Sequence, residues 1–547
     1  MPIPERSTAG LGLQNPTLSA QSESRQRPEA FFLNSRPLPV WKDAKPASQN
    51  VITRDLVGRA GLWHSREEQG ARAVKNQSTP RERVCRAMTT APSADSHRIA
   101  AIVLGAGKGN RMRSRLPKVL HRIGNRPMIL HTLEAVRAAG AQTSVVVVAP
   151  DMDSVADAVA PTVTVVQHEQ LGTADAVKPA REVAGCGFET VLILYGDTPF
   201  ISAETLEAMV ALRANGEHGV VALGFRPKRP GAYGRLVLSE SGELKAIVEA
   251  KDATAAQSNI GLCNSGAMAV DGTILFELID QVGNENASGE YYLTDIVEIA
   301  CRQGRTCGVV EADPDELLGI NSRAELASAE QIFQQKKRSA AMEGGATLVD
   351  PETVWFSHDT VIGQDVIIEP QVIFGPGVAL ADNVEIKAFS HIEGATVANG
   401  AVVGPFARLR PATSLQEGAR VGNFVEVKAA LLKSGAKVAH LAYIGDAEIG
   451  TEANIGAGTI TCNYDGFLKS RTIVGDGAFI GSNTALVAPV TIGKGAIVGA
   501  GSTIAADVAE DALALTRAEH TAIPRAAAKF RDRKKAEKAK QAPEKKG

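Results

Sequence analysis

A chain of 547 residues is too long to fold around one hydrophobic core, and its ordinary fractions of charged and apolar residues predict two or three globular domains. The net charge of −2 says nothing about partners, no nucleic-acid or membrane partner is predicted, and no apolar run approaches the length of a membrane span. The six cysteines show neither paired metal-ligand spacing nor a dense disulfide framework, which predicts reduced thiols in a cytoplasmic protein.

Residues 1–95 differ from the rest of the chain. They are rich in Pro, Ser, Gln and Arg and have no sustained hydrophobic period. The segment lacks the apolar run of a secretory signal, although an Arg-rich, Ser-containing leader is also compatible with an organelle transit peptide. We expect a disordered extension, or an upstream start assigned in error with initiation at Met88.

A buried strand is predicted over Ile99–Leu104, and a glycine-rich turn follows at residues 105–112. Its backbone N–H groups and the charges of Lys108, Arg111 and Lys118 suit the phosphates of a nucleotide. The turn is not a P-loop, because its lysine is not followed by Ser or Thr, and no acidic residue stands at the dinucleotide-binding distance. By itself, such a loop is equally compatible with a simple tight turn.

Helices and strands continue to alternate, with a helix at residues 128–139 and strands at Thr143–Val148, 162–166 and 191–194. This order predicts an α/β domain with a Rossmann-like open sheet. Asp197 follows the last of these strands, at the sheet edge where open α/β sheets bind ligands. A lone Asp there is often a helix cap, but the nearby phosphate loop favours a metal ligand.

A linker helix is predicted over residues 321–342. Residues 334–338 (QQKKR) are expected on its exposed face, where a short basic patch is more often solvated than bound to nucleic acid. The opposite, apolar face is formed by Leu326, Ala329, Ile332 and Phe333.

Aliphatic residues then return every six positions between residues 361 and 506, which is the signature of a hexapeptide-repeat, left-handed parallel β-helix. The residue four positions after each hexad start is expected to point inward with it. Because such a solenoid has flat faces and a filled core, an active site must lie on an outer face, in a loop or between associated solenoids, and a homotrimer is expected. The hexad starts are Ile362, Ile368, Phe374, Leu380, Ile386 and Ile392 in the first block and Val474, Ile480, Leu486, Ile492, Val498 and Ile504 in the last.

The hexads are interrupted by residues 404–411 (GPFARLRP) with 422–428 (GNFVEVK), and again by 440–446 (HLAYIGD). A third run, residues 454–466, ends in a loop at residues 465–471. Breaking a strict repeat costs regular packing, so these exceptions are where function is predicted.

Together these motifs resemble the bacterial bifunctional N-acetylglucosamine-1-phosphate uridylyltransferase/glucosamine-1-phosphate acetyltransferase family. The resemblance covers residues 97–525, and many short motifs in one order are more specific than any one of them. The motifs that carry the resemblance are residues 104–112, Lys118, 170–173 (QLGT), 195–197 (YGD), 233–235 (YGR), Glu249, Asn264, 289–295 (GEYYLTD) and 319–323 (GINSR), followed by the solenoid motifs.

The resemblance implies Mg²⁺-dependent uridylyl transfer from UTP. The attacking sugar phosphate is already anionic, so the reaction needs cations and in-line positioning rather than a general base. Asp197 and Asn321 are then the metal ligands. The implied UTP and UDP-N-acetylglucosamine contacts are Arg111 and Lys118 for the triphosphate, Gln167, Gly172 and Thr173 for uracil, Gly234, Glu249 and Asn264 for the acceptor sugar, and also Leu104, Gly105, Ala106, Gly107, Tyr195, Gly196, Asp197 and Asn321.

Three positions depart from the family pattern. The family's usual loop has Ala at Gly105 and Thr at Asn110, and the residue after Thr173 is usually Gly rather than Ala174. Gly105 and Asn110 both suit a turn, so little effect on phosphate binding is expected. Ala174 restricts the backbone near the base.

The second implied reaction is acetyl transfer from acetyl-CoA. An ammonium must lose a proton before it attacks a thioester, and a His of near-neutral pKa is the usual acceptor. His440, which alone would also suit a surface histidine with satisfied hydrogen bonds, is the implied base. The implied glucosamine-1-phosphate contacts are Arg410, Lys428, Tyr443 and Asn454, and the acetyl-CoA contacts, in a groove between neighbouring solenoids, are Ala457, Asn463, Tyr464, Ser482, Ala500 and Arg517.

The expected organisation is the extension at 1–95, a uridylyltransferase domain at 96–323, a linker helix at 324–345, a β-helix acetyltransferase domain at 346–524 and a basic flexible tail at 525–547. The expected function is acetylation of glucosamine-1-phosphate and then uridylyl transfer, giving UDP-N-acetylglucosamine for peptidoglycan and lipopolysaccharide precursors. Two alternatives remain: a single-activity sugar-phosphate nucleotidyltransferase whose β-helix only oligomerises, and a non-catalytic scaffold of nucleotide-exchange complexes.

Overall fold

The computed structural model describes residues 97–107, 109–216 and 218–541. The expectations for residues 1–95 and for Lys108 lie outside the described residues. Among the described helices, none is both long enough and apolar enough to cross a membrane.

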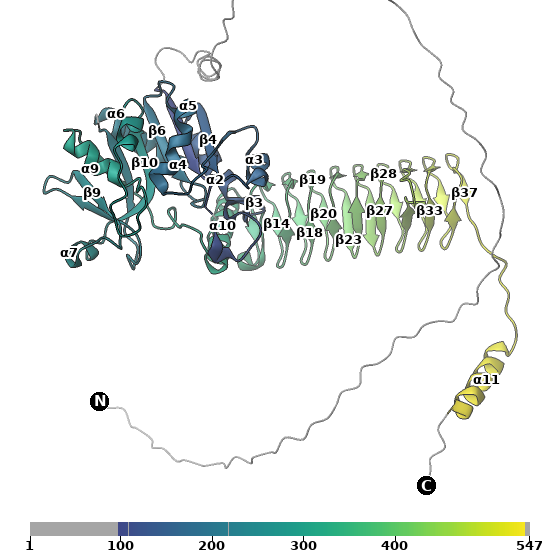
Figure 1. Ribbon diagram of the computed structural model, residues 1–547. Coiled ribbons are helices and arrows are strands. Elements are labelled where there is room, and N and C mark those ends of the chain that lie inside the picture. The colour runs from purple at the N-terminus through teal and green to yellow at the C-terminus, as the bar shows by residue number, and fades with distance from the viewer. Residues whose placement is uncertain (1–96, 108, 217, 542–547) are drawn as a thin grey trace, which may run out of the picture. The chain divides into compact units, whose positions relative to one another are not determined.

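The first part of the described chain is built on a mixed open sheet (Figure 1). The strand order is β11-β7-β10-β6-β1-β4-β5; β10 runs antiparallel to β6 and β7, and the other neighbours on this path are parallel. The predicted α/β fold with a Rossmann-like sheet is confirmed. The strands are β1 (Ile99–Leu104), β4 (Thr143–Val148), β5 (Val163–Val166), β6 (Thr190–Tyr195), β7 (Val220–Phe225), β10 (Cys263–Asp271) and β11 (Cys307–Glu311), with β8 (Arg235–Leu238) and β9 (Leu244–Val248) attached to β10.

Every residue of β1 is buried, because helices cover both faces of the sheet and leave no polar side to the strand. Short 3₁₀ turns and the hairpin β2 (Arg122–Ile123)–β3 (Arg126–Pro127) follow the phosphate loop. The helices are α2 (Met128–Ala138), α3 (Asp153–Val159), α4 (Thr173–Val177), α5 (Arg181–Ala184), α6 (Ala203–Asn215), α7 (Ala255–Ser258), α8 (Leu275–Asp280) and α9 (Asp295–Arg302), and the 3₁₀ turns are η1 (Asn110–Met112), η2 (Lys118–Leu120) and η3 (Lys178–Ala180).

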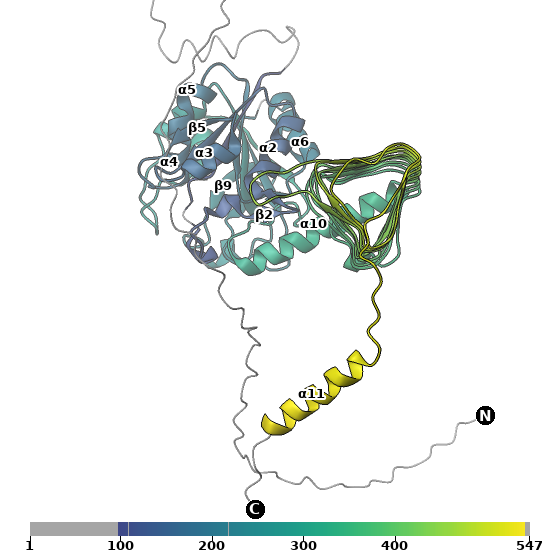
Figure 2. The same ribbon diagram turned by 90° about the vertical axis from the view of Figure 1, so that its right-hand side faces the viewer.

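The second part is a left-handed parallel β-helix, as predicted. Successive short strands join three parallel sheets in turn: one from β12 (Thr347–Leu348) to β37 (Leu513–Ala514), one from β13 (Val361–Ile362) to β34 (Val490–Ile492), and one from β15 (Ile373–Phe374) to β36 (Thr503–Ile504). Figure 2 shows the triangular section of these coils. The hexad starts are buried from Ile368 onward, and the inward residues Val366, Val372, Val378, Ala478, Thr484 and Val490 are at most 2% exposed. Thr396, four positions after Ile392, is exposed instead, because the six-residue register ends there and Ala395 and Val397 face the core.

Helix α10 (Arg323–Glu343) corrects one prediction about the linker. Residues 334–338 were expected to be exposed, yet Gln334 and Arg338 are buried. Gln334 bonds both backbone groups of Phe356 at 2.7 Å, and Arg338 donates to the carbonyls of Val354 and Glu352 at 2.9 Å each. These two side chains satisfy backbone groups in residues 352–356 at the start of the β-helix, which have no preceding coil to pair with.

Two further findings concern the C-terminal tail and the cysteines. Within the expected basic tail, an exposed helix, α11 (Ala526–Gln541), forms because its Ala, Lys, Arg and Glu residues have high helix propensity. Reduced thiols are confirmed for Cys263, Cys301, Cys307 and Cys462, whereas the sulfur of Cys186 is disulfide-bonded.

Candidate active sites

A cavity of about 380 Å³ lies at the carboxyl edge of the open sheet, beside β1 and β6. Most of the predicted nucleotide contacts line it: Leu104, Gly105, Ala106, Gly107, Lys118, Gln167, Gly172, Thr173, Tyr195, Asp197 and Asn321. Four lining residues were not predicted: Val119, Gln170, Ala176 and Glu290. The structure therefore gathers one set of side chains from segments more than 200 residues apart in the sequence.

The glycine-rich turn is anchored to the sheet and to η2. The Gly105 N–H donates to the Val147 carbonyl at 2.8 Å, and a Cβ at Gly105 would lie 3.2 Å from the same oxygen. Gly109 has φ +60°, and a Cβ there would lie 2.6 Å from Cβ of Lys118. Glycine is therefore required at Gly109 by both conformation and space, and this close packing fixes the base of Lys118 next to the turn.

Asp197 and Asn321 are brought to one point by the backbone. The Ile320 N–H donates to the Asp197 carbonyl at 3.0 Å, and the Asn321 N–H donates to Glu325 Oε2 at 2.7 Å. Glu325 also completes the capping box of α10 with Ser322, so the start of this helix positions Asn321. Asp197 is not a helix cap, because Ser202 caps α6.

The two side chains face the same cation. The ammonium of Lys118 is ion-paired with Asp197 and lies 3.0 Å from Oδ1 of Asn321. A carboxylate and an amide oxygen directed at one positive charge fit a hard divalent cation, which would take its other ligands from water or phosphate. Among the described residues, no cluster of three or more His, Cys, Asp or Glu forms a larger metal site.

The predicted base-reading residues surround the start of α4. Gln167 is buried, and its Nε2 donates to Asp175 Oδ2 at 2.9 Å, which fixes the orientation of its amide. Gly172 has φ +134°, and a Cβ there would lie 2.4 Å from the Tyr291 carbonyl oxygen. The Ala174 N–H donates to that oxygen at 2.9 Å, so it is not directed at a base.

Gln170 lines the cavity, although the sequence analysis did not predict it as a nucleotide contact. Its Nε2 donates to the Ala106 carbonyl at 2.7 Å, which joins the base-reading segment to the phosphate loop. The signal was present, because Gln170 begins the QLGT motif, but only the fold shows which main-chain group it meets.

Gly234, Glu249 and Asn264 come together beside this cavity rather than in its lining. The Asn264 N–H donates to the Gly234 carbonyl at 2.9 Å, and a Cβ on Gly234 would lie 3.5 Å from Glu249 Oε2. Burial raises the pKa of Glu249, which accepts a long hydrogen bond from Thr294 Oγ1 at 3.4 Å. Of the other two predicted contacts outside the lining, Gly196 bonds the Leu104 carbonyl and Arg111 is exposed in η1.

Asp295, at the start of α9 near Glu249, provides a test of this region. Burial, with the charges of Glu298, Glu249 and Asp252, raises the pKa of Asp295 to about 6 from an ordinary 3.8. The folded state therefore disfavours the ionised form of Asp295. The resulting loss of folding stability is absent below about pH 4, grows as the pH rises, and is complete above about pH 6. Asp295→Asn is expected to raise the melting temperature by roughly 2–4 °C at pH 7.5.

This gain should shrink toward zero as the pH of the melting measurement falls to 4. Asp153→Asn, at an exposed position in the first turn of α3, is the matched control and should show no such pH dependence. A gain for Asp295→Asn that stayed constant from pH 4 to 8 would contradict the assignment.

The β-helix carries a second group of predicted residues along one corner. Main-chain hydrogen bonds link successive coils there: Leu441 N–H to the Asn423 carbonyl, Gly458 N–H to His440, Asn483 N–H to Ala457, and Gly501 N–H to Ser482, at 2.7–3.2 Å. The residues stacked in this column are Asn423, His440, Ala457, Ser482 and Ala500. His440, the implied base, thus lies in one column with three of the implied acetyl-CoA contacts, which are Ala457, Ser482 and Ala500.

His440 ends strand β26 (Lys437–His440), and its side chain is exposed. Its Nδ1 lies 2.6 Å from Oδ1 of Asn423, which stands opposite it on β23 (Arg420–Asn423). An amide oxygen only accepts hydrogen bonds, so this contact puts the ring hydrogen on Nδ1 and leaves the Nε2 lone pair available as a base.

Three cations gather at the adjoining sheet and the loop before β31 (Thr472–Val474). Arg410, just after β21 (Arg408–Leu409), pairs with Glu426 Oε1 at 2.8 Å, and Lys428 ends β24 (Glu426–Lys428). Contact with the Lys469 ammonium, together with the charge of Arg410, lowers the pKa of Lys428. Like charges held together favour an anionic ligand. Lys469 was not predicted, because its loop reaches Lys428 only in the folded chain.

Tyr443 and Asn463 meet over a glycine. A Cβ on Gly445 would lie 2.4 Å from the Tyr443 hydroxyl and 2.8 Å from Nδ2 of Asn463, so only glycine leaves room for both. Asn463 also donates to Asp446. Asn454 begins β29 (Asn454–Ile455) on the sheet that carries His440, and Tyr464 is exposed in the neighbouring loop. The Arg517 guanidinium donates to the Ala500 carbonyl at 3.0 Å, at the end of the corner column.

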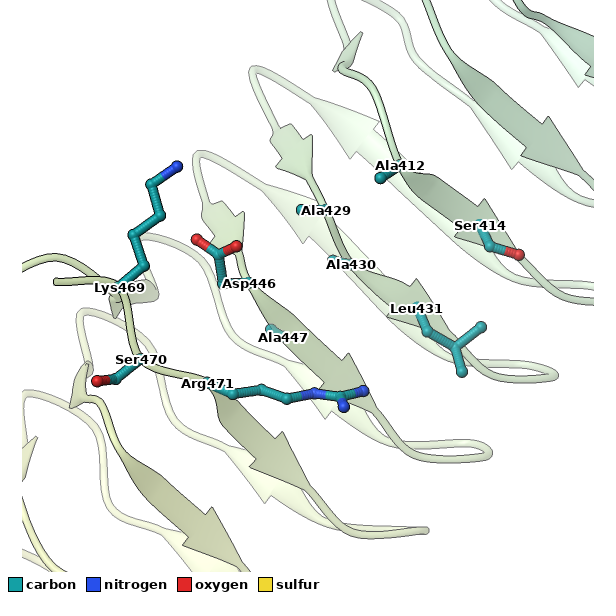
Figure 3. Close-up of a pocket in the computed structure, with 10 residues that line it drawn as sticks. All are labelled: Ala412, Ser414, Ala429, Ala430, Leu431, Asp446, Ala447, Lys469, Ser470 and Arg471. Atoms are coloured by element: carbon teal, nitrogen blue, oxygen red, sulfur yellow. The ribbon is translucent and has the colours of Figure 1, made fainter. Parts of the chain in front are cut away.

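A shallow cavity of about 450 Å³ that the sequence did not predict lies on the β-helix; Figure 3 shows the residues that line it. Its floor is made of small side chains from successive coils, and Asp446, Lys469 and Arg471 stand at one end. Because Lys469 also contacts Lys428, the cavity adjoins the cationic group.

Comparisons with known proteins agree with both parts of the fold. Residues 101–260 match the MobA-like NTP transferase domain, and residues 359–394 and 471–506 match the bacterial transferase hexapeptide (six repeats). The chain is 55% identical to the bifunctional protein GlmU of Paramagnetospirillum magneticum over 446 residues, which are 81% of this chain and 99% of that protein.

Two further relatives carry the same name. The identity is 62% to the bifunctional protein GlmU of Rhodospirillum rubrum, over 79% of this chain and 97% of that protein. It is 55% to that of Azorhizobium caulinodans, over 77% and 94%. With both domain types present in one chain and aligned over nearly the whole length of such relatives, the chain belongs to the bifunctional GlmU family.

Proposed function

We propose that the chain acetylates glucosamine-1-phosphate with acetyl-CoA and then transfers uridylyl from UTP to the resulting N-acetylglucosamine-1-phosphate, releasing pyrophosphate and forming UDP-N-acetylglucosamine. Residues 346–524 carry the first reaction and residues 96–323 the second, with residues 324–345 as the connecting helix. The observation that carries this proposal is that one chain holds a phosphate-loop cavity in which a carboxylate and an amide oxygen face one cation and, on a separate fold, a corner with an exposed histidine and an adjoining group of three cations.

In the uridylyl site, Asp197 and Asn321 would hold Mg²⁺, which neutralises phosphate charge when bound. The glycine turn, Lys118 and Arg111 orient the triphosphate, and Gln167, with its amide fixed by Asp175, reads the base. Glu249 and Asn264 hold the hydroxyl and amide groups of the acceptor sugar. The sugar phosphate attacks the α-phosphorus, and no residue has to remove a proton.

In the acetyl site, Arg410, Lys428 and Lys469 would hold the phosphate of glucosamine-1-phosphate. Nε2 of His440 then accepts a proton from the ammonium, so that the free amine attacks the thioester and the CoA thiolate leaves. Asn423 holds the ring hydrogen on Nδ1 and would stabilise the imidazolium that forms. The small residues Ala457, Ser482 and Ala500 let the thin pantetheine arm lie close to the backbone.

The same corner supports assembly into a homotrimer. Phe389, Phe406 and Phe424 stack with ring centroids 4.8 and 5.1 Å apart, and with Leu441 they are 46–60% exposed. We call these four residues the apolar ladder. Beyond Leu441 the equivalent positions are Gly458, Asn483 and Gly501. A bulky ladder suits burial against a neighbouring solenoid, and the two glycines and one asparagine that follow, which carry no large apolar side chain, leave a groove for a cofactor.

Breaking the apolar ladder should therefore dissociate the trimer. Phe406→Glu places a charge in the ladder, and sedimentation velocity is expected to show a smaller species. Acetyl transfer should fall with it, because the groove needs the neighbour, while uridylyl transfer persists. Leu238→Glu, at an exposed apolar position on β8, is the control and should leave the assembly intact. A Phe406→Glu protein that remained trimeric would contradict this interface.

The function itself is tested by incubating the chain with glucosamine-1-phosphate, acetyl-CoA, UTP and Mg²⁺ and analysing the products by mass. Omitting acetyl-CoA should leave the substrates unchanged, and omitting UTP should stop the reaction at N-acetylglucosamine-1-phosphate. Formation of a nucleotide sugar with glucosamine-1-phosphate unacetylated in the complete mixture would favour the single-activity alternative.

A further inference from the structure

The ammonium of Lys118 lies between the two side chains proposed to hold the metal. It is ion-paired with the Asp197 carboxylate and donates to Oδ1 of Asn321 at 3.0 Å. The Lys118 and Asp197 side chains are only 13% and 14% exposed. A compact ammonium and a divalent cation are attracted to the same oxygens, so both cannot occupy this position together.

We propose that Lys118 is a built-in counter-cation that must leave before the metal binds, and that its movement couples metal binding to nucleotide binding. The proposal rests on the proposed function, because it assumes that Asp197 and Asn321 are the metal ligands. It concerns a second role for Lys118, besides its contact with the triphosphate.

The surroundings of Lys118 allow such an exchange. Its backbone and Cβ are fixed, because η2 begins at Lys118 and Gly109 packs directly on its Cβ. Its four-carbon stem is flexible, and the phosphate loop, Gly105 to Gly107, lines the same cavity. A bound triphosphate would therefore offer the displaced ammonium a new anionic partner within reach of the same side chain.

Without nucleotide, a metal entering the site has to break the Lys118–Asp197 pair and leave the ammonium beside a divalent cation. With nucleotide, the ammonium transfers to phosphate and the repulsion is removed. Metal alone should therefore bind weakly, and metal and nucleotide should strengthen each other's binding reciprocally.

The test is a titration of the full-length chain with Mn²⁺, followed by electron paramagnetic resonance, first without nucleotide. Lys118→Met keeps the apolar stem and removes the charge, so Mn²⁺ is expected to bind about tenfold more tightly than in the wild type. Lys118→Gln should give the same change. The factor by which Mn²⁺ raises UTP affinity, measured without an acceptor sugar, should fall by at least as much.

Two control variants separate the possible failures. Arg111→Met removes another cation proposed to meet the triphosphate. Among the described residues no ion pair joins Arg111 to Asp197 and no hydrogen bond joins it to Asn321, so nucleotide-free Mn²⁺ affinity should not change. Asp197→Asn should weaken Mn²⁺ binding; if it does not, the proposed metal site itself is wrong. Unchanged Mn²⁺ affinity in both Lys118 variants, with Asp197→Asn weakened, would overturn the counter-cation role alone.

Discussion

His440→Ala is expected to reduce acetyl transfer by about 10²–10⁴-fold, the range typical for loss of a general base. The attacking group of glucosamine-1-phosphate is an ammonium at neutral pH, and the Nε2 lone pair of His440 is the acceptor that the Asn423 contact leaves free. Uridylyl transfer should be unchanged, because it takes place on a separate fold and requires no proton acceptor. The measurement is release of CoA thiol alongside release of pyrophosphate in the same preparation.

His391→Ala is the matched control, because His391 is also an exposed histidine on a β-helix strand, β18 (His391–Ile392), and lies outside the corner column. It should leave thiol release at the wild-type rate. Retained acetyl transfer in His440→Ala would refute the base assignment and favour a β-helix that only assembles the oligomer. A pH–rate profile would add to the test, since the acidic limb of acetyl transfer should report the pKa of the base.

Asp197→Ala is expected to have the opposite selectivity, lowering uridylyl transfer by at least about 10²–10³-fold while acetyl transfer continues. Removing the carboxylate takes away the only charged ligand of the proposed pair, and it also frees Lys118 from its partner. The transition state would then lose the divalent charge that offsets the repulsion between two phosphates. Pyrophosphate release at saturating UTP and Mg²⁺ measures the effect.

Asp153→Asn, an exposed carboxylate in the same domain, controls for a general effect of lost charge and should retain wild-type pyrophosphate release. If Asp197→Ala keeps normal pyrophosphate release, Asp197 does not hold the metal. Loss of both activities in Asp197→Ala would instead indicate misfolding, which melting curves of the variant would show directly.

The regular parts of this protein could be predicted because their patterns are local. A fully apolar segment at Ile99–Leu104 predicts a buried strand from its own residues, and the six-residue periods of Ile362–Ile392 and Val474–Ile504 each specify one short strand per hexad. The phosphate loop is equally local, since its glycines and the strand before it are contiguous. The family resemblance then assigned a role to each site residue, and the variants above test these roles.

The contacts between distant segments could not be predicted in this way. Gln334 and Arg338 follow a polar, basic pattern that favours exposure, yet they are buried because the first coil of the β-helix offers unpaired backbone groups. Lys469 belongs to an irregular loop, and only the fold brings it to Lys428. The periodicity of a sequence does not indicate which residues of a distant segment a side chain will contact.

The sequence by itself determined that the chain pairs an open α/β sheet with a left-handed β-helix, because alternation and the six-residue period fix which side chains face a core. The tertiary structure alone decided that His440, Ala457, Ser482 and Ala500 form one column, and that Lys118 lies between Asp197 and Asn321. The stacking of coils places the residues of the column above one another, and the packing at the edge of the open sheet brings Lys118, Asp197 and Asn321 together. They depend on how separate segments pack and not on the composition of any one of them.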